Sequence, residues 1–379
     1  MNGHPASRIP PTPRASFASL RLADQRPQRI RSANTFLFGR YGIYQGLRAY
    51  GVGAGHRVLI PSYICRVAAD AIEATGAGVD FYMVDEKLRP DYDDLVARIT
   101  PETRAVLVVH YFGFMQPLEP FREICSRCKL LLIEDAAHVF PGAWSDAGTV
   151  GDFTVFSWRK FLPVMDGSDL LFQDGKKIAL AKASMGIQAR SVKHVIDNLG
   201  VQDGAFARVT SGAVRLLRGS RTSSPAKNGS GPPAQAVGSS SLEFTASLVG
   251  YGASGASEFV RSHTDSNALY EARRHNYMTL VRQLAQLQCA TRPLFHELPS
   301  EVCPLQCPVW NDSPLFHRAL RKRGIPATAW EDVIPPTLDL DRFPTAKKLY
   351  NHLFFLPVHQ GLTVSDMKLM AEIVGGPPA

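Results

Sequence analysis

The sequence predicts an α/β fold built on a mostly parallel, doubly wound sheet, and three observations support this class. Short apolar runs that are typical of buried strands recur between residues 40 and 160. Helical patterns separate these runs, an alternation that places helices on both faces of a parallel sheet. The composition, with 45% hydrophobic and 20% charged residues, is that of a globular protein, and 379 residues are enough for one large and one small domain.

The expected strands follow one another at regular intervals. We expect them at 57–60, 79–85, 104–113, 130–133, 153–156 and 166–172. A helical pattern opens at Gly39 and ends at Gly51, and a second one spans 89–100. The second pattern carries Pro90 at its start and acids in its first turn, where the helix dipole favours them. This order favours βαβ units over an antiparallel sheet.

Three regions are expected along the chain. Residues 1–32 hold six arginines and a single acid, Asp24, and we expect them to form a basic, poorly ordered arm. Residues 33–265 form the large domain, in which the Gly/Ser/Pro-rich stretch 219–241 reads as a flexible insertion. Residues 266–379 form a smaller C-terminal domain.

The distribution of charge and of apolar residues indicates which kinds of partner to expect. Five of the eight net positive charges lie in the arm, where an organellar transit peptide is the alternative to simple disorder. No aromatic residues interleave with these arginines in a binding module, so no nucleic-acid partner is expected. No run of about 18 apolar residues and no secretory apolar region occur, so we expect no membrane span and a cytoplasmic location.

The six cysteines do not predict a metal site. Cys125 and Cys128 fall in an expected helix, where a spacing of three residues is that of ordinary packing residues. A zinc site that adds Cys303 and Cys307 is the alternative. We therefore expect reduced thiols and no bound metal.

The residues that carry chemistry gather in the stretch 129–167. Asp135 and His138 follow the strand expected at 130–133, while Ser157 and Lys160 follow the next one. Because ligands bind beyond the carboxyl ends of strands in open α/β sheets, an acid, an imidazole, a hydroxyl and an amine should meet at one sheet edge. Pyridoxal phosphate requires such a set, with a lysine amine to hold it and an Asp or Arg partner for its ring nitrogen.

The motif EDAAH at 134–138, followed by Ser157, Lys160 and Gly167, resembles the core of the DegT/DnrJ/EryC1/StrS aminotransferases. The resemblance implies a fold-type-I pyridoxal-phosphate enzyme, a seven-stranded sheet, a C-terminal α+β domain and a homodimer. It also implies an amino acid donor, with L-glutamate expected, and a keto-sugar acceptor attached to a nucleotide. The interval between Ser157 and Lys160 is two residues shorter than in the family, which weakens the Ser157 assignment.

The start of the first large helix is the expected phosphate site. GRYG at 39–42 resembles the family segment that holds the cofactor phosphate, with Arg40 where a threonine is usual. A helix that starts after a glycine offers N–H groups to an anion, and an arginine there adds a direct charge, so Gly39, Arg40 and Tyr41 are expected to bind the cofactor. The alternative is a plain helix start with an exposed arginine.

Cys65 occupies the position at which the family places an aromatic residue on the cofactor ring. A thiol offers less area than an aromatic side chain. Either Cys65 covers the ring, or Tyr63 or Tyr111 takes its place, or Cys65 is only a small core residue.

The sequence thus predicts a transaminase in which Lys160 is the catalytic amine, Asp135 the partner of the ring nitrogen and His138 a hydrogen-bond donor. The Lys160 amine must be neutral to transfer a proton, so we expect burial to lower its pKa. Relatives that dehydrate sugars carry histidine in place of this lysine, which argues against the dehydratase or epimerase alternative. A member without catalysis, acting as a binding or regulatory protein, is the second alternative, because Cys65 departs from the pattern and a GxNxRM motif is missing.

Overall fold

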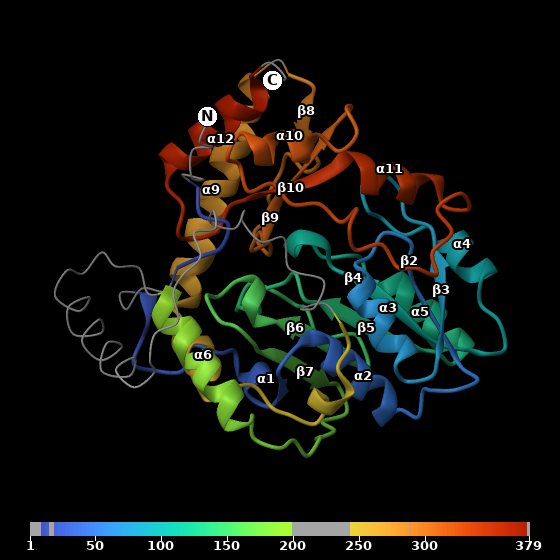
Figure 1. The fold of residues 1–379 in the computed structure, drawn as a ribbon. Coiled ribbons are helices and arrows are strands. Elements are labelled where there is room, and N and C mark those ends of the chain that lie inside the picture. The colour runs from blue at the N-terminus through green and yellow to red at the C-terminus, as the bar shows by residue number, and fades with distance from the viewer. Residues whose placement is uncertain (1–8, 15–18, 199–242, 288, 377–379) are drawn as a thin grey trace, which may run out of the picture.

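The computed structural model describes residues 9–14, 19–198, 243–287 and 289–376, and its main element is a seven-stranded sheet. The strand order is β1-β7-β6-β5-β4-β2-β3 (Figure 1). Strands β2 to β6 are parallel to one another, whereas β7 runs antiparallel to both β6 and β1. The strands are β1 (Asn34–Phe36), β2 (Arg57–Pro61), β3 (Gly78–Tyr82), β4 (Thr103–Val109), β5 (Leu131–Ala136), β6 (Phe153–Ser157) and β7 (Ser168–Phe172). The predicted α/β class with a mostly parallel sheet is confirmed.

Helices connect these strands, and several begin at side chains that accept a backbone N–H. Asp91 Oδ1 accepts from the Asp94 N–H at 3.0 Å, and Asp265 accepts from Ala268 in the same way. The helices are α1 (Gln28–Arg31), α2 (Gly39–Ala49), α3 (Arg66–Glu73), α4 (Tyr92–Ala97), α5 (Glu119–Cys128), α6 (Met185–Asn198), α8 (Gly255–His263), α9 (Ser266–Gln286), α10 (Phe316–Lys322), α11 (Pro344–His352) and α12 (Val364–Gly375). Short 3₁₀ turns occur at η2 (Tyr111–Gly113), η3 (Trp158–Lys160) and η5 (Ala246–Leu248).

Helix α2 lies unusually close to the sheet because two glycines face strand β6. A Cβ at Gly42 would lie 3.3 Å from Val155 Cγ1. A Cβ at Gly46 would lie only 2.5 Å from the Phe153 ring. Side chains at these positions would lift the helix, so the glycines fix where its N-terminus lies relative to β6.

A second, three-stranded antiparallel sheet lies in the C-terminal region, at the top of Figure 1. Its order is β10-β9-β8, with β8 (Thr291–Pro293), β9 (Gln306–Asn311) and β10 (Leu353–Pro357). Helices α9 and α12 pack on it and share a hydrophobic core with it. The region matches the smaller α+β domain that the resemblance implied. The boundary at residues 265 and 266 stays a prediction, although α9 begins at Ser266.

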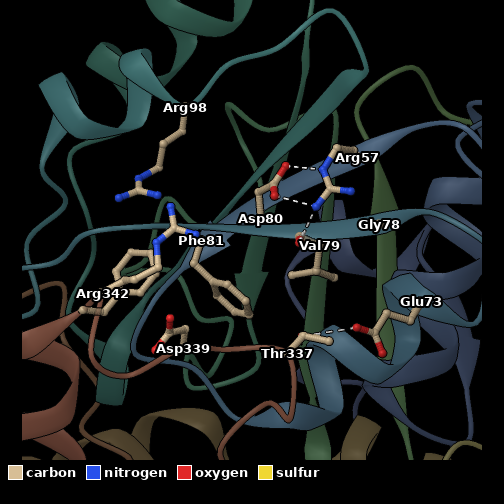
Figure 2. Close-up of a pocket in the computed structure, with 11 residues that line it drawn as sticks. Arg57, Glu73, Gly78, Val79, Asp80, Phe81, Arg98, Thr337, Asp339 and Arg342 are labelled. Carbon is tan, nitrogen blue, oxygen red and sulfur yellow. Dashed lines mark hydrogen bonds and ion pairs between the residues drawn. The ribbon is translucent and has the colours of Figure 1, made fainter.

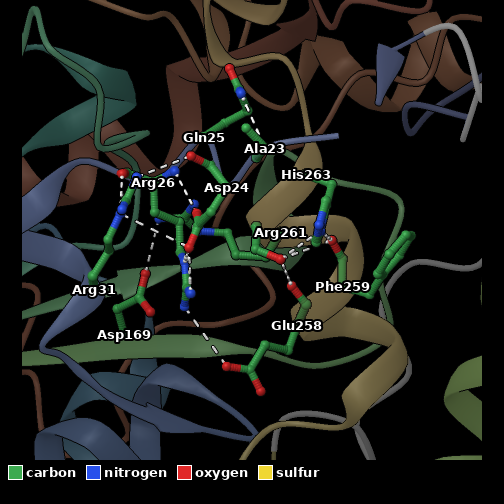
Figure 3. A network of polar contacts seen from close by, with 11 residues as sticks. Ala23, Asp24, Gln25, Arg26, Arg31, Asp169, Glu258, Phe259, Arg261 and His263 are labelled. Carbon is green, nitrogen blue, oxygen red and sulfur yellow. Dashed lines mark hydrogen bonds and ion pairs between the residues drawn. The ribbon is translucent and has the colours of Figure 1, made fainter. Parts of the chain in front are cut away.

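The N-terminal region differs from the poorly ordered arm that we expected over residues 1–32. In its described parts, 9–14 and 19–32, Ile9 is buried in the core of the second sheet and Ile30 packs beneath β5 and β6. Arg26 donates to Asp24 at 2.7 Å and lies 3.7 Å from Glu258 (Figure 3). The count of charges did not take into account that apolar side chains between the arginines, such as Ile9 and Ile30, are buried.

Three further expectations concern the insertion, the cysteines and a membrane span. The insertion expected at 219–241 lies outside the described residues. Cys125 packs in the main core, and Cys303 and Cys307 are buried. Among the described residues, no cluster of three or more potential ligands has the geometry to hold a metal ion. In the same part of the chain, no helix combines the length and the apolar character needed to cross a bilayer.

Candidate active site

Strand β5 separates its two consecutive acids onto opposite faces of the sheet. Asp135 is in register with Val155 of β6 and Val109 of β4, and Val155 lies under helix α2. Side chains alternate along a strand, so the preceding Glu134 points to the other face. There it accepts from the backbone N–H of Gly151 at 2.6 Å and faces His110 Nε2 at 3.2 Å. Of these two acids, only Asp135 therefore lies on the face of the sheet that helix α2 covers.

Asp135 and Lys160 meet in one cavity of about 130 Å³ on that face. Lys160 ends the 3₁₀ turn η3, which follows directly after β6. Burial lowers the pKa of the Lys160 amine, and the Asp135 charge opposes this shift. Burial likewise raises the pKa of the Asp135 carboxyl, against the charge of Lys160. The expected direction of the Lys160 shift is found, and the acid and the amine influence each other across the cavity.

His138 lines the same cavity and is held in one tautomer by the backbone. Its Nδ1 accepts from the Phe112 N–H at 3.2 Å, so the proton of the neutral ring lies on Nε2. Burial, with the Lys160 charge, holds its pKa well below the usual value. Phe112 itself has a φ of +57°, a left-handed conformation that turns its N–H toward the imidazole. His138 is thus a neutral hydrogen-bond donor.

Of the other predicted site residues, four line the cavity and one does not. Ser157, Gly39, Arg40 and Cys65 contribute to its wall. Tyr41, one helical position beyond Arg40, turns away and packs edge-on against Phe244 at 5.5 Å. Successive helical residues point about 100° apart, which explains the separation of Arg40 from Tyr41.

Arg159 is a member of the site that the sequence reasoning missed. The turn η3 directs it into the cavity beside Arg40, and both guanidinium groups lie over the ring of Phe38, at 5.4 and 4.8 Å. Burial lowers the pKa of both arginines, and the charge of Arg40 adds to the shift at Arg159. Two neighbouring cations at the start of helix α2 have the charge that would suit an anion. The adjacent pair Arg159-Lys160 was the only signal in the sequence.

The lysine turn is held by a buried arginine from helix α9. Phe161 O, just after Lys160, accepts from Arg273 Nη2 at 3.3 Å and from Gln360 Nε2 at 2.9 Å. Arg273 also donates to Leu305 O at 3.0 Å, and burial lowers its pKa to about 10. The C-terminal region thereby helps to place the amine.

The aromatic side chains near the cavity differ from those expected. Tyr63 and Tyr111 are buried in the core, where the Tyr111 hydroxyl donates to Tyr63 O at 2.6 Å, and neither lines the cavity. Trp330, from the C-terminal region, does line it, although no pattern in the sequence indicated this.

A larger cavity of about 450 Å³ lies beside the edge strand β3 (Figure 2). It is lined by three arginines, but Asp80 accepts from Arg57 Nη2 at 2.5 Å and Asp94 pairs with Arg98 at 2.7 Å. Arg342 and Asp339 also line it, and Arg342 lies beside Arg98. None of the predicted site residues reaches this cavity, and its acids already offset much of the positive charge.

Comparison with known proteins agrees with the geometry around Asp135 and Lys160. The chain is similar to a dTDP-4-dehydro-2,3,6-trideoxy-D-glucose 4-aminotransferase from Saccharopolyspora spinosa, with 34% identity over 134 residues, which are 34% of this chain. The matched part spans about a third, 35%, of that relative's length.

Two solved structures share the fold over most of the chain. The aminotransferase TlmJ from Streptoalloteichus hindustanus superposes with a TM-score of 0.61, at 20% identity, covering 93% of this chain and 91% of its own. The structure of ntda from Bacillus subtilis with bound cofactor PMP gives a TM-score of 0.60, at 16% identity, with 90% and 73% covered.

The sequence model of the DegT/DnrJ/EryC1/StrS aminotransferase family matches residues 35–202. This stretch contains every residue that lines the Asp135–Lys160 cavity except Trp330. The stretch that supplies the other lining residues is thus similar to the DegT/DnrJ/EryC1/StrS aminotransferase family.

Proposed function

We propose that this protein is a pyridoxal-phosphate-dependent aminotransferase that transfers an amino group from an amino acid, with L-glutamate expected, to a nucleotide-linked keto-sugar. The observation that carries the proposal is the shared cavity in which Asp135 and Lys160 face each other beside an arginine pair. The residues fit this cofactor, because an amine, an acid and an anion site occupy one pocket. The named relative, which acts on a dTDP-linked sugar, supports the substrate class.

Each side chain has a chemical role in this proposal. Pyridoxal phosphate, when bound, supplies an electron sink for the α-carbon of an amino acid. The Asp135 carboxylate would bind the protonated ring nitrogen, and the arginine pair Arg40 and Arg159 would bind the phosphate at the start of α2. His138 Nε2–H donates to the ring oxygen or to substrate.

Lys160 performs the proton transfer. Burial lowers the pKa of its amine, which favours the neutral form of Nζ over that of an exposed lysine. A neutral Nζ can hold the cofactor and can accept the proton from the substrate α-carbon, then return it as a general acid. Val109, Val155 and Ala137 give the cavity an apolar lining beside this exchange.

The first test is spectroscopic. The purified protein, supplied with pyridoxal phosphate, should show a visible absorption band that borohydride reduction removes. Lys160→Ala should lack the band, whereas Lys182→Ala, which removes an exposed lysine outside the cavity, should keep it. A wild-type protein that stays colourless would favour the binding-protein alternative.

The second test concerns the substrates. Glutamate should convert the bound cofactor to its amino form, measured as loss of the visible band. A panel of nucleotide-linked keto-sugars should then restore the band. We also infer a homodimer and a cytoplasmic location, which light scattering after size-exclusion chromatography and cell fractionation would test.

A further inference from the structure

We propose that Trp330 supplies the aromatic surface against which the pyridoxal-phosphate ring packs. The inference rests on the proposed function and deepens it. Trp330 belongs to the C-terminal region, far along the chain from Asp135 and Lys160, yet all three residues line the same cavity. The hydrogen bonds of the loop that carries Trp330 determine where the indole lies.

Backbone hydrogen bonds attach the Trp330 loop to both parts of the molecule. Thr328 and Phe355 of β10 exchange two backbone bonds, at 3.0 and 2.7 Å, which fix the start of the loop. Val333 N–H donates to Trp330 O at 3.0 Å and closes a tight turn. Val333 O in turn accepts from the N–H of Arg66, the first residue of α3, at 2.7 Å. The loop is therefore tied to the second sheet on one side and to the large sheet's helix on the other.

Aromatic contacts then fix the orientation of the indole. It stacks on Tyr63, with ring centroids 4.9 Å apart and 28° between planes, and meets Phe355 edge-on at 5.6 Å. His138 lies 5.5 Å away, on the cavity side. Aromatic side chains packed in this way lose little further freedom when a flat ring binds against them.

The cavity offers no better aromatic surface beside the Asp135–Lys160 pair. Cys65 supplies only a thiol, His138 only a small imidazole, and the apolar residues around the acid and the amine, such as Val109 and Val155, are aliphatic. Phe38 also lines the cavity, but the guanidinium groups of Arg40 and Arg159 lie over its ring. A pyridinium ring held between an acid and an amine gains most from an aromatic face, and Trp330 is the aromatic side chain of the described cavity wall that is available to it.

The affinity of the apo-protein for pyridoxal phosphate tests this role directly. Trp330→Ala should weaken binding, measured by titrating the visible band, by about tenfold or more, while Trp330→Phe should stay within about threefold. Trp310→Phe is the matched control, because Trp310 stacks on His352 and donates to Asp312 outside the cavity. Far-UV circular dichroism and the melting temperature of each variant report whether the fold is intact.

Two further measurements separate ring contact from a structural role. Pyridoxal phosphate should quench indole fluorescence more in wild type and Trp310→Phe than in Trp330→Phe. Adding Cys65→Phe to Trp330→Ala should recover part of the lost affinity, whereas Cys65→Phe alone should weaken binding, because both side chains line one cavity. Additive effects of the two substitutions would contradict a shared role.

Failures of the two proposals are distinguishable. A wild-type protein that takes up no pyridoxal phosphate would overturn both the proposed function and the role of Trp330. Normal uptake with unchanged affinity in Trp330→Ala would overturn this inference alone. A Trp330→Ala variant whose only defect is a raised KM for the amino acceptor would also overturn it, since the indole would then contact substrate and not the cofactor.

Discussion

Glu134 and Asp135 are neighbours on strand β5, but their side chains lie on opposite faces of the sheet and have different roles. Asp135 has a backbone partner, Ala137 N–H at 3.0 Å, and otherwise faces the cavity. Glu134 is fully buried, and burial would raise its pKa, but the bond to His110 and the N–H groups of Gly148 and Gly151 reverse the shift and lower it. Glu134, which has several hydrogen-bond donors, therefore stabilises the fold, whereas Asp135, which has few, is left to act in the site.

We therefore expect opposite phenotypes from two neighbouring substitutions. Asp135→Asn should reduce kcat by about 100-fold or more, because an amide does not stabilise the charged ring nitrogen, while the melting temperature changes little. Glu134→Gln should lower the free energy of unfolding by about 1–3 kcal/mol, because the amide nitrogen faces buried donors. Half-reaction kinetics and urea unfolding of both variants provide the measurements. Equal losses of stability in the two variants would contradict the assignment.

The pH dependence of cofactor uptake is a second prediction at this scale. Only the neutral Lys160 amine attacks an aldehyde, so the rate of uptake by the apo-protein should rise with pH through the Lys160 pKa. Burial places that pKa below its usual value, and the charge of Asp135 raises it partway back. Asp135→Asn removes the opposing charge, so the rise should move to lower pH. Stopped-flow absorbance at a series of pH values measures it, and a shift to higher pH would exclude this coupling.

At the scale of elements, the contact between α2 and β6 determines where the anion site lies. Gly46→Ala should lower the free energy of unfolding by about 1–3 kcal/mol, because the new methyl would meet the buried Phe153 ring at 2.5 Å. It should also weaken pyridoxal-phosphate binding, since the start of α2 moves with the helix. Gly186→Ala in helix α6 is the control, because a Cβ there meets nothing within 4 Å.

Urea unfolding and spectral titration of these two glycine variants provide the readouts. The higher helix propensity of alanine should leave Gly186→Ala neutral or more stable by up to about 1 kcal/mol. A Gly46→Ala variant that behaves like the control would show that α2 can shift without cost.

The elements also show why some of the site was predictable and some was not. Asp135, His138 and Lys160 follow consecutive strands, so chain order alone brings them to one edge of the sheet. Arg159 was missed because a 3₁₀ turn directs two neighbouring residues into the same cavity. Trp330 was missed because a backbone bridge between Thr328 and Phe355 places it, and no local pattern encodes a contact of that range.

At the scale of the whole molecule, the N-terminal segment joins both cores. His359 Nε2 donates to Pro10 O at 3.0 Å, next to Ile9 in the second core. Further along, Arg21 N–H donates to His263 O and Asp265 N–H to Ser19 O, both near 2.7–2.8 Å, which adds a strand-like contact beside α8. The Arg261–Asp169 pair at 3.3 Å, fully buried, then connects α8 to strand β7 (Figure 3). The described parts of this segment pack against partners that are distant in sequence, and local composition does not encode such contacts.

The contact at His359 predicts a loss of stability in mild acid. Burial lowers the His359 pKa to about 4, so the unfolded state binds the proton first as the pH falls. Stability from this residue is complete above pH 6.5 and should fall by up to about 3 kcal/mol toward pH 4. His359→Gln removes the titration, so its urea midpoint should decline less over that range. Parallel declines of wild type and variant would contradict this account.

The burial of Ile9 beside Met370 has a consequence for biosynthesis. Ribosomes release Ile9 long before its partners in the core of the second sheet, of which Tyr277 is the first along the chain. Ile9 must therefore remain exposed to chaperones or to aggregation until those partners have been made. Closing so long a loop delays the last step of folding, and the nascent protein should be most vulnerable to proteases until α12 docks.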